Sequence, residues 1–177
     1  MAACLVHNSQ PQGCIGDTCV LAGATERGSS ALDATLMVVA GLLLAASGLG
    51  FLLLARGRGR SQTAGVVAAL TGSLALVLLL SALIVASQDP DWEGMPGLVV
   101  PGVVLLAIAM VSIGVHVLRS GVLPLAVAAL LIVTACLLPF ANEQTSLILL
   151  AIPFGLAWVV AGVALLRQPN NAAALSQ

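Results

Sequence analysis

Residues 31–60 read ALDATLMVVAGLLLAASGLGFLLLARGRGR, an apolar run with one acid near its start that ends in Arg56, Arg58 and Arg60. About 20 apolar residues are enough for a helix to cross the hydrocarbon core of a bilayer. Arginines that follow such a run mark its cytoplasmic end, because cytoplasmic loops are enriched in Lys and Arg. This stretch therefore predicts a membrane-spanning helix and the direction in which it crosses.

The rest of the chain continues the same pattern. Hydrophobic residues make up 60% of the 177 residues and charged residues 7%, whereas a soluble domain has about 25% charged residues. So few charges cannot cover a folded core in water, so lipid must surround most of the chain. Five segments are apolar enough to span: 31–55, 65–87, 98–118, 122–138 and 146–166.

The connections between these segments are short, which makes neighbouring helices antiparallel. The sequence thus predicts an all-α polytopic membrane bundle of five transmembrane helices within residues 31–167. An extracytoplasmic, Cys-containing tail of residues 1–30 precedes the bundle, and a polar cytoplasmic tail of residues 168–177 follows it.

The orientation of the bundle follows from its arginines. Alternation places five of the six on one side of the membrane, namely Arg56, Arg58, Arg60, Arg119 and Arg167. Arg27 falls on the other side. The positive-inside rule makes the arginine-rich side cytoplasmic, with the N-terminus outside and the C-terminus inside. The lack of Lys and the excess of Ala, Val, Leu and Gly favour a bacterial plasma membrane.

A weak internal repeat accompanies these arginines. Residues 109–119 and 157–167 share the pattern Ala-x-Val-x-x-Gly-Val-x-x-Leu-Arg, and residues 48–56 are a looser echo that also ends in Arg. The repeat indicates one helix followed by two similar hairpins. Convergent composition is the alternative, because Ala, Val, Leu and Gly dominate every segment.

Ionisable side chains are nearly absent from the predicted spans. Asp33 lies at the start of the first span, and His116 lies one turn before Arg119, where we expect an interfacial side chain. Ionisable groups inside hydrocarbon mark proton relays, ion pathways and voltage sensors. No metalloprotease, serine-hydrolase or P-loop motif occurs either. These features argue against an enzyme or an ion-coupled transporter, and the net charge of −1 against nucleic-acid binding.

The N-terminal tail contains the other candidate chemistry, Cys4, His7, Cys14 and Cys19. An external tail lies in an oxidising compartment, where disulfides persist, and we favour a Cys14–Cys19 disulfide. The alternatives are a zinc or copper site made by these four residues, and thiol exchange with Cys136 near the outer end of the fourth span. Incidental cysteines in a polar tail are the remaining interpretation.

The function that these observations favour is non-enzymatic. We expect an accessory or scaffold subunit of a membrane complex, without a cofactor, whose partners are the lipid bilayer and other membrane subunits or further copies of the chain. Two alternatives stay open. One is thiol-redox or metal handling by the tail, and the other is small-molecule transport through an outward cleft near Pro153.

Overall fold

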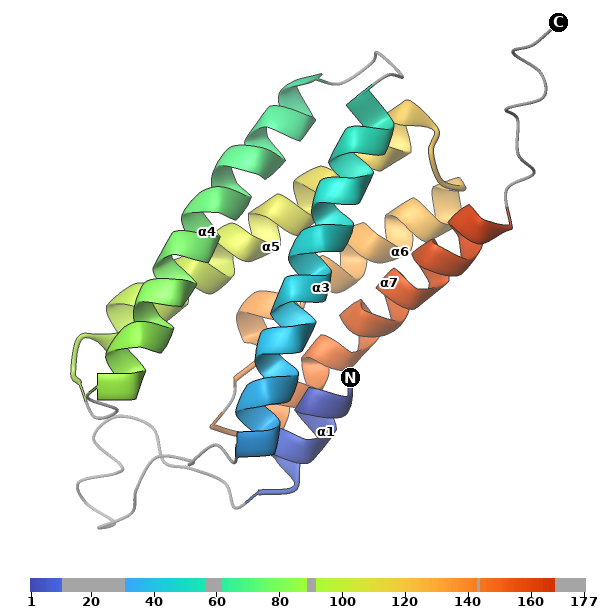
Figure 1. Ribbon diagram of the computed structural model, residues 1–177. Coiled ribbons are helices and arrows are strands. Elements are labelled where there is room, and N and C mark those ends of the chain that lie inside the picture. Colours follow the sequence, from blue (N-terminus) through green and yellow to red (C-terminus); the bar gives the residue numbers. More distant parts are fainter. Residues whose placement is uncertain (11–30, 57–61, 89–91, 143, 168–177) are drawn as a thin grey trace, which may run out of the picture.

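The computed structural model describes residues 1–10, 31–56, 62–88, 92–142 and 144–167, and this part of the chain contains helices and no strand (Figure 1). Helices α3 to α7 run up and down beside one another. The elements in chain order are α1 (Ala2–Asn8), α3 (Ala31–Arg56), α4 (Gln62–Gln88), α5 (Met95–Ser120), α6 (Leu125–Ala135), the 3-10 helices η1 (Leu138–Phe140) and η2 (Ser146–Leu150), and α7 (Ala151–Leu166).

Four described segments are long and apolar enough to cross a membrane: Thr35–Leu54, Gln62–Gln88, Met95–Ser120 and Ser146–Leu166. They match the predicted spans 31–55, 65–87, 98–118 and 146–166. The remaining predicted span, 122–138, forms α6 and η1, whose apolar stretch Leu125–Phe140 is shorter than these four. The all-helical class is confirmed. The fifth span and the direction of the termini stay predictions.

Small residues set the contact between α4 and α5, the most extensive helix pair of the fold. A Cβ added at Gly102 would lie 2.8 Å from Leu79 Cδ2, one at Gly72 would lie 3.6 Å from Ala109 Cβ, and one at Gly65 would lie 3.3 Å from His116 Cε1. These three contacts are seven residues apart on both helices, which is the spacing of an antiparallel coiled-coil seam. Glycine or alanine in each pair lets the backbones come close.

A left-handed glycine ends α5 and directs the chain into α6. Gly121 has φ 66°, and the N–H groups of Gly121 and Val122 donate to the carbonyls of Leu118 and Val117. This is a Schellman arrangement, in which the apolar residue after the glycine packs back on the last turn. Val117 and Val122 are both fully buried, so the turn is held by packing as well as by hydrogen bonds.

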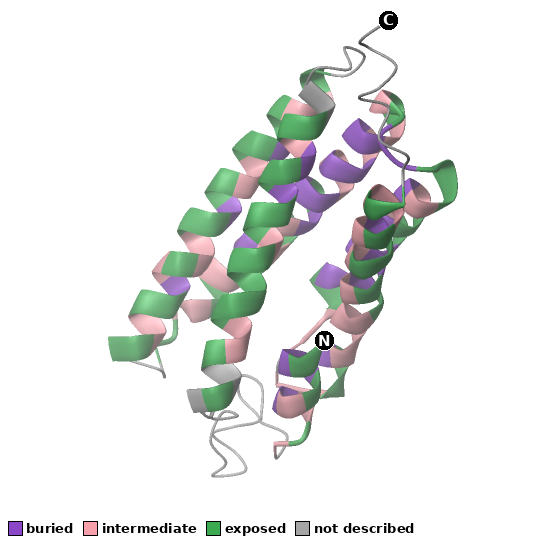
Figure 2. Cartoon of the chain, turned by 45° about the vertical axis from the view of Figure 1, so that its right-hand side comes forward, coloured by how far each residue is buried: buried purple, intermediate pink, exposed green. Residues whose placement is uncertain are grey.

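The buried core follows α5, and the outer faces of α3 and α4 are exposed (Figure 2). Met110, Ile113 and Val117 of α5 pack with Leu131 of α6 and Phe154 of α7. The exposed residues are large and apolar, for example Leu42, Leu70 and Leu125, at 66%, 66% and 70% exposure. An apolar exterior of this kind is stable in lipid and would aggregate in water.

Gly114 on α5 marks the closest approach to α6. A Cβ at this position would lie 2.6 Å from Ile132 Cγ1. We expect Gly114→Ala to lower the free energy of unfolding by about 1–3 kcal/mol, because the added methyl overpacks the interface. Ile132→Ala removes the colliding atom, so the double variant should be more stable than the sum of the two single effects predicts.

Unfolding in bicelles by SDS titration, followed by circular dichroism, measures this effect. Gly162→Ala is the matched control, because nothing lies within 4 Å of a Cβ at Gly162. Equal losses of stability for Gly114→Ala and Gly162→Ala would contradict the close α5–α6 contact.

Candidate functional site

The structure describes only part of the predicted cysteine site. Cys4 and His7 lie three residues apart on α1, and both are buried, at 8% and 5% exposure. Cys14 and Cys19 lie outside the described residues, so the disulfide and the four-ligand metal site stay predictions. Within the described residues, no three His, Cys, Asp or Glu side chains gather as a metal site.

The structure adds a helix that the sequence analysis did not predict within residues 1–30. Helix α1 packs against α3 and η2, and a Cβ added at Gly155 of α7 would lie 3.1 Å from Met1 Cγ. Cys4 and His7 therefore take part in packing α1 onto the bundle. Cys136 is exposed at the C-terminal end of α6, and both described thiols are free.

The topology-setting arginines fall at helix ends. Arg119 lies in the last turn of α5 and Arg167 directly after α7, and both are exposed. Arg56 is the last residue of α3, while Arg58 and Arg60 lie outside the described residues. The C-terminal ends of α3, α5 and α7 lie toward one end of the bundle (Figure 1). A cation at a helix C-terminus is also favoured by the helix dipole.

His116 is buried at 6% exposure, and its ring lies over Gly65 of α4. A Cβ at Gly65 would lie 3.3–3.6 Å from three ring atoms. Glycine at this position therefore gives the imidazole its space between the helices. His116 is thus a packing residue of the α4–α5 contact, and its depth at the membrane interface stays a prediction.

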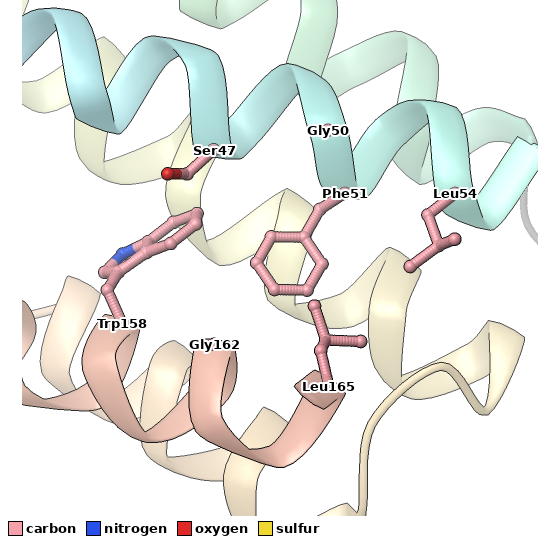
Figure 3. Close-up of a pocket in the computed structure, with 7 residues that line it drawn as sticks. All are labelled: Ser47, Gly50, Phe51, Leu54, Trp158, Gly162 and Leu165. Atoms are coloured by element: carbon pink, nitrogen blue, oxygen red, sulfur yellow. The ribbon is translucent and has the colours of Figure 1, made fainter. Parts of the chain in front are cut away.

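The described part of the chain has a groove of about 340 Å³ between α3 and α7 (Figure 3). It is lined by Ser47, Gly50, Phe51, Leu54, Trp158, Gly162 and Leu165. A volume of this size is at the lower end of the range for small-molecule sites. The lining is apolar apart from Ser47, whose hydroxyl donates to the Leu43 carbonyl at 2.7 Å. The groove therefore suits an apolar occupant.

Three aromatic rings form one wall of the groove and its support. Trp158 meets Phe51 edge to face, with ring centroids 5.4 Å apart, and meets Phe154 in the same way at 6.0 Å. Within the described residues, Trp158 Nε1 is covered and has no hydrogen-bond acceptor. It lies on the side of the indole away from Phe51 (Figure 3). The indole thus presents its carbon ring to the groove.

The residues that line the groove on α3 and on α7 lie at equal distances along the chain from the arginine that ends each helix. Ser47 and Trp158 lie nine residues before Arg56 and Arg167, Phe51 and Gly162 lie five before, and Leu54 and Leu165 two before. Both helices run in the same direction, so residues at equal distances from the arginines lie at similar depth. A large side chain is paired with a small one at the first two levels.

The sequence alone does not predict the groove, although it contains a signal for it. The loose repeat between residues 48–56 and 157–167 aligns the same arginines and hence the same lining positions. On its own, this repeat indicates one helix followed by two similar hairpins. A repeat does not specify how α3 and α7 pack on the core. It therefore does not predict that the two helices lie across a shared groove.

Comparison with known proteins gives no relative: no protein-family model, no curated protein and no solved structure matches this chain. The fold itself defines the class. The part of the chain that the structure describes is all-helical and has four helices long and apolar enough to cross a membrane, which is consistent with an integral membrane protein.

The aromatic contact in the groove can be measured directly. Phe51→Leu and Trp158→Leu keep apolar bulk and remove the edge-to-face pair. We expect a coupling free energy of about 0.5–1.5 kcal/mol between the two sites, the usual value for such pairs. A double-mutant cycle of unfolding free energies in bicelles gives this quantity. Strictly additive effects would show that the two rings do not interact.

Cys136 reports the orientation of the bundle. In a chain whose other cysteines are serine, a membrane-impermeant maleimide should label Cys136 in intact cells, since this exposed thiol lies at the end of α6 opposite Arg119. A cysteine introduced after Arg167 should be labelled only after lysis. The reverse pattern would place the N-terminus in the cytoplasm.

Proposed function

We propose that this chain is a non-enzymatic accessory or scaffold subunit of a bacterial plasma-membrane complex, with its N-terminus outside, and that it associates with other membrane helices through the outer half of α3. The observation that carries this proposal is the incomplete packing of α3. It is a 26-residue apolar helix, yet most of its side chains are exposed.

The packed edge of α3 is narrow. Phe51 is buried in the core, and a Cβ at Gly48 would lie 3.2 Å from Ile113 Cδ1 of α5. Toward the outer end the contacts change. Nothing lies within 4 Å of a Cβ at Gly41, and Ala45 is exposed one turn later.

Gly41 and Ala45 form a small-xxx-small pair on an open helix surface. Helices in lipid associate through close van der Waals packing, and such pairs allow the backbones to approach. In contrast, Gly65, Gly72 and Gly102 of the α4–α5 contact already face side chains of the partner helix. The outer half of α3 is therefore the surface at which a further helix would gain most from packing.

The proposed non-enzymatic role agrees with the chemistry of the spans. The four long apolar segments contain no Asp, Glu or Lys, and Arg occurs in them only at Arg119, in the last turn of α5. Their one histidine, His116, packs on Gly65. The groove between α3 and α7 offers apolar carbon and one hydroxyl. Binding and assembly fit this inventory better than catalysis does.

Association through α3 is tested with fluorescent-protein fusions in liposomes. For a scaffold, which self-associates, we expect energy transfer between wild-type copies to fall with the Gly41→Leu/Ala45→Leu variant, with association about 10-fold weaker, equivalent to about 1.4 kcal/mol. Gly97→Leu is the matched control, because nothing lies within 4 Å of a Cβ there either.

The same variants distinguish a scaffold from an accessory subunit. A scaffold shows energy transfer with purified protein alone. An accessory subunit shows none, but purifies from its own membranes with one stoichiometric partner that the α3 variant loses and Gly97→Leu keeps. Complexes that do not respond to the α3 variant would overturn the proposal. One equivalent of zinc or copper lost on Cys4→Ser, or solute flux into liposomes with purified protein, would replace it.

A further inference from the structure

We propose that the groove between α3 and α7 holds one acyl chain of an anionic phospholipid, drawn from the leaflet on the arginine side of the membrane. This site lies on a different side of α3 from Gly41 and Ala45 and does not rest on the proposed subunit role. Its occupant is identified by the chemistry, the length and the charge of the groove.

The lining selects a flexible apolar chain. Phe51, Leu54 and Leu165 contribute hydrocarbon, and Trp158 presents its carbon ring (Figure 3). Gly50 and Gly162 have no side chains, and nothing lies within 4 Å of a Cβ at either position. The two glycines thus leave open space on opposite helices at the middle of the groove.

The length of the groove corresponds to one leaflet. Its lining runs from Ser47 to Leu54 on α3 and from Trp158 to Leu165 on α7, about 10 Å at 1.5 Å per residue. The terminal arginines follow two residues later, about 3 Å further. The sum is close to the roughly 15 Å that is half of a 30 Å hydrocarbon core. A chain with its headgroup at the arginine level therefore reaches Trp158.

This geometry argues against a transmembrane helix as the occupant. A helix is about 10 Å across and crosses both leaflets. The groove has a volume of about 340 Å³, and its lining ends at Ser47 and Trp158, near the middle of the bilayer. The groove accommodates the inner part of one acyl chain, and it ends at the depth that the end of this chain reaches.

The positive charge at the end of α7, beyond the lining of the groove, would favour an anionic headgroup. Arg167 is exposed directly after α7, two residues beyond the lining Leu165. Arginine binds phosphate with parallel N–H donors. Lipid-facing basic residues of this kind attract anionic lipids by about 1 kcal/mol per charge. The acyl chain would fix the position of the lipid, and Arg167 would favour a negatively charged one.

Trp158 is a built-in reporter for the site. The chain has two tryptophans, and Trp92→Phe leaves Trp158 as the single fluorophore. The probes are phosphatidylglycerol and phosphatidylcholine with one dibrominated acyl chain, titrated into dioleoylphosphatidylcholine vesicles that contain the full-length protein. Bromine quenches indole on contact, so the titration follows occupancy beside Trp158.

We expect brominated phosphatidylglycerol to reach half-maximal quenching at a mole fraction about fivefold lower than brominated phosphatidylcholine, a ratio that corresponds to about 1 kcal/mol. Arg167→Gln should make the two lipids equal, whereas Arg119→Gln on α5 should not. Gly162→Leu fills the groove and should abolish the preference, whereas Gly41→Leu should keep it.

Identical quenching curves for the two lipids in the wild-type protein would overturn the proposal and leave only ordinary boundary lipid at Trp158. This comparison needs no substitution in the groove, so misfolding of a variant does not affect it. A preference that survives Gly162→Leu would also overturn it, because the anionic lipid would then lie elsewhere. Native mass spectrometry should retain one phosphatidylglycerol on the wild type and none on Gly162→Leu.

Discussion

The structure depends on the close contact between α4 and α5. Lipid is as apolar as leucine, so burial of hydrocarbon does not draw helices together inside a bilayer, and dense packing must do it. The three contacts at seven-residue intervals, Leu79 on Gly102, Gly72 on Ala109 and Gly65 on His116, give this pair its register. Helix α5 then serves as the central element on which α3 and α6 pack.

Three hydroxyls of the long helices form their hydrogen bonds within a single helix. The hydroxyls of Ser47, Thr71 and Thr134 donate to the carbonyls of Leu43, Val67 and Leu130, four residues earlier on the same helix, at 2.7 Å in each case. Such bonds satisfy the hydroxyl inside hydrocarbon without linking two helices. These three hydroxyls therefore add no link between helices, whereas close contacts such as that at Gly114 depend on shape and are sensitive to a single methyl group.

Hydropathy alone predicted the helical class and four spans with boundaries within four residues, because a membrane requires backbone hydrogen bonds to close within each segment. It did not predict α1, since AACLVHN is too short and too mixed in character to show a helical period. It also missed the groove at Phe51 and Trp158. Every face of a membrane helix is apolar, so sequence periodicity does not distinguish a face that packs from one that meets lipid.

The arginine-anchored register of α3 and α7 shows how much of such a site a sequence does contain. Ser47 with Trp158 and Phe51 with Gly162 are related by equal distances from the terminal arginines. The pairing of large with small residues is visible in the sequence once the helices are known to lie across a common groove. The sequence does not show that α3 and α7 are neighbours, because their placement depends on the contacts that each makes with the core.

The short helix α6 has a consequence for the surrounding bilayer. The apolar stretch Leu125–Phe140 measures about 24 Å at 1.5 Å per residue, several ångströms less than a typical hydrocarbon core of about 30 Å. If α6 crosses the membrane as the fifth span that the sequence predicts, the lipids beside it must shorten or tilt their chains, while those beside α4 need not. Because of this hydrophobic mismatch, a change in membrane thickness affects mainly the side of the protein that carries α6. Thin bilayers relieve it, and thick ones favour burying α6 against another protein surface.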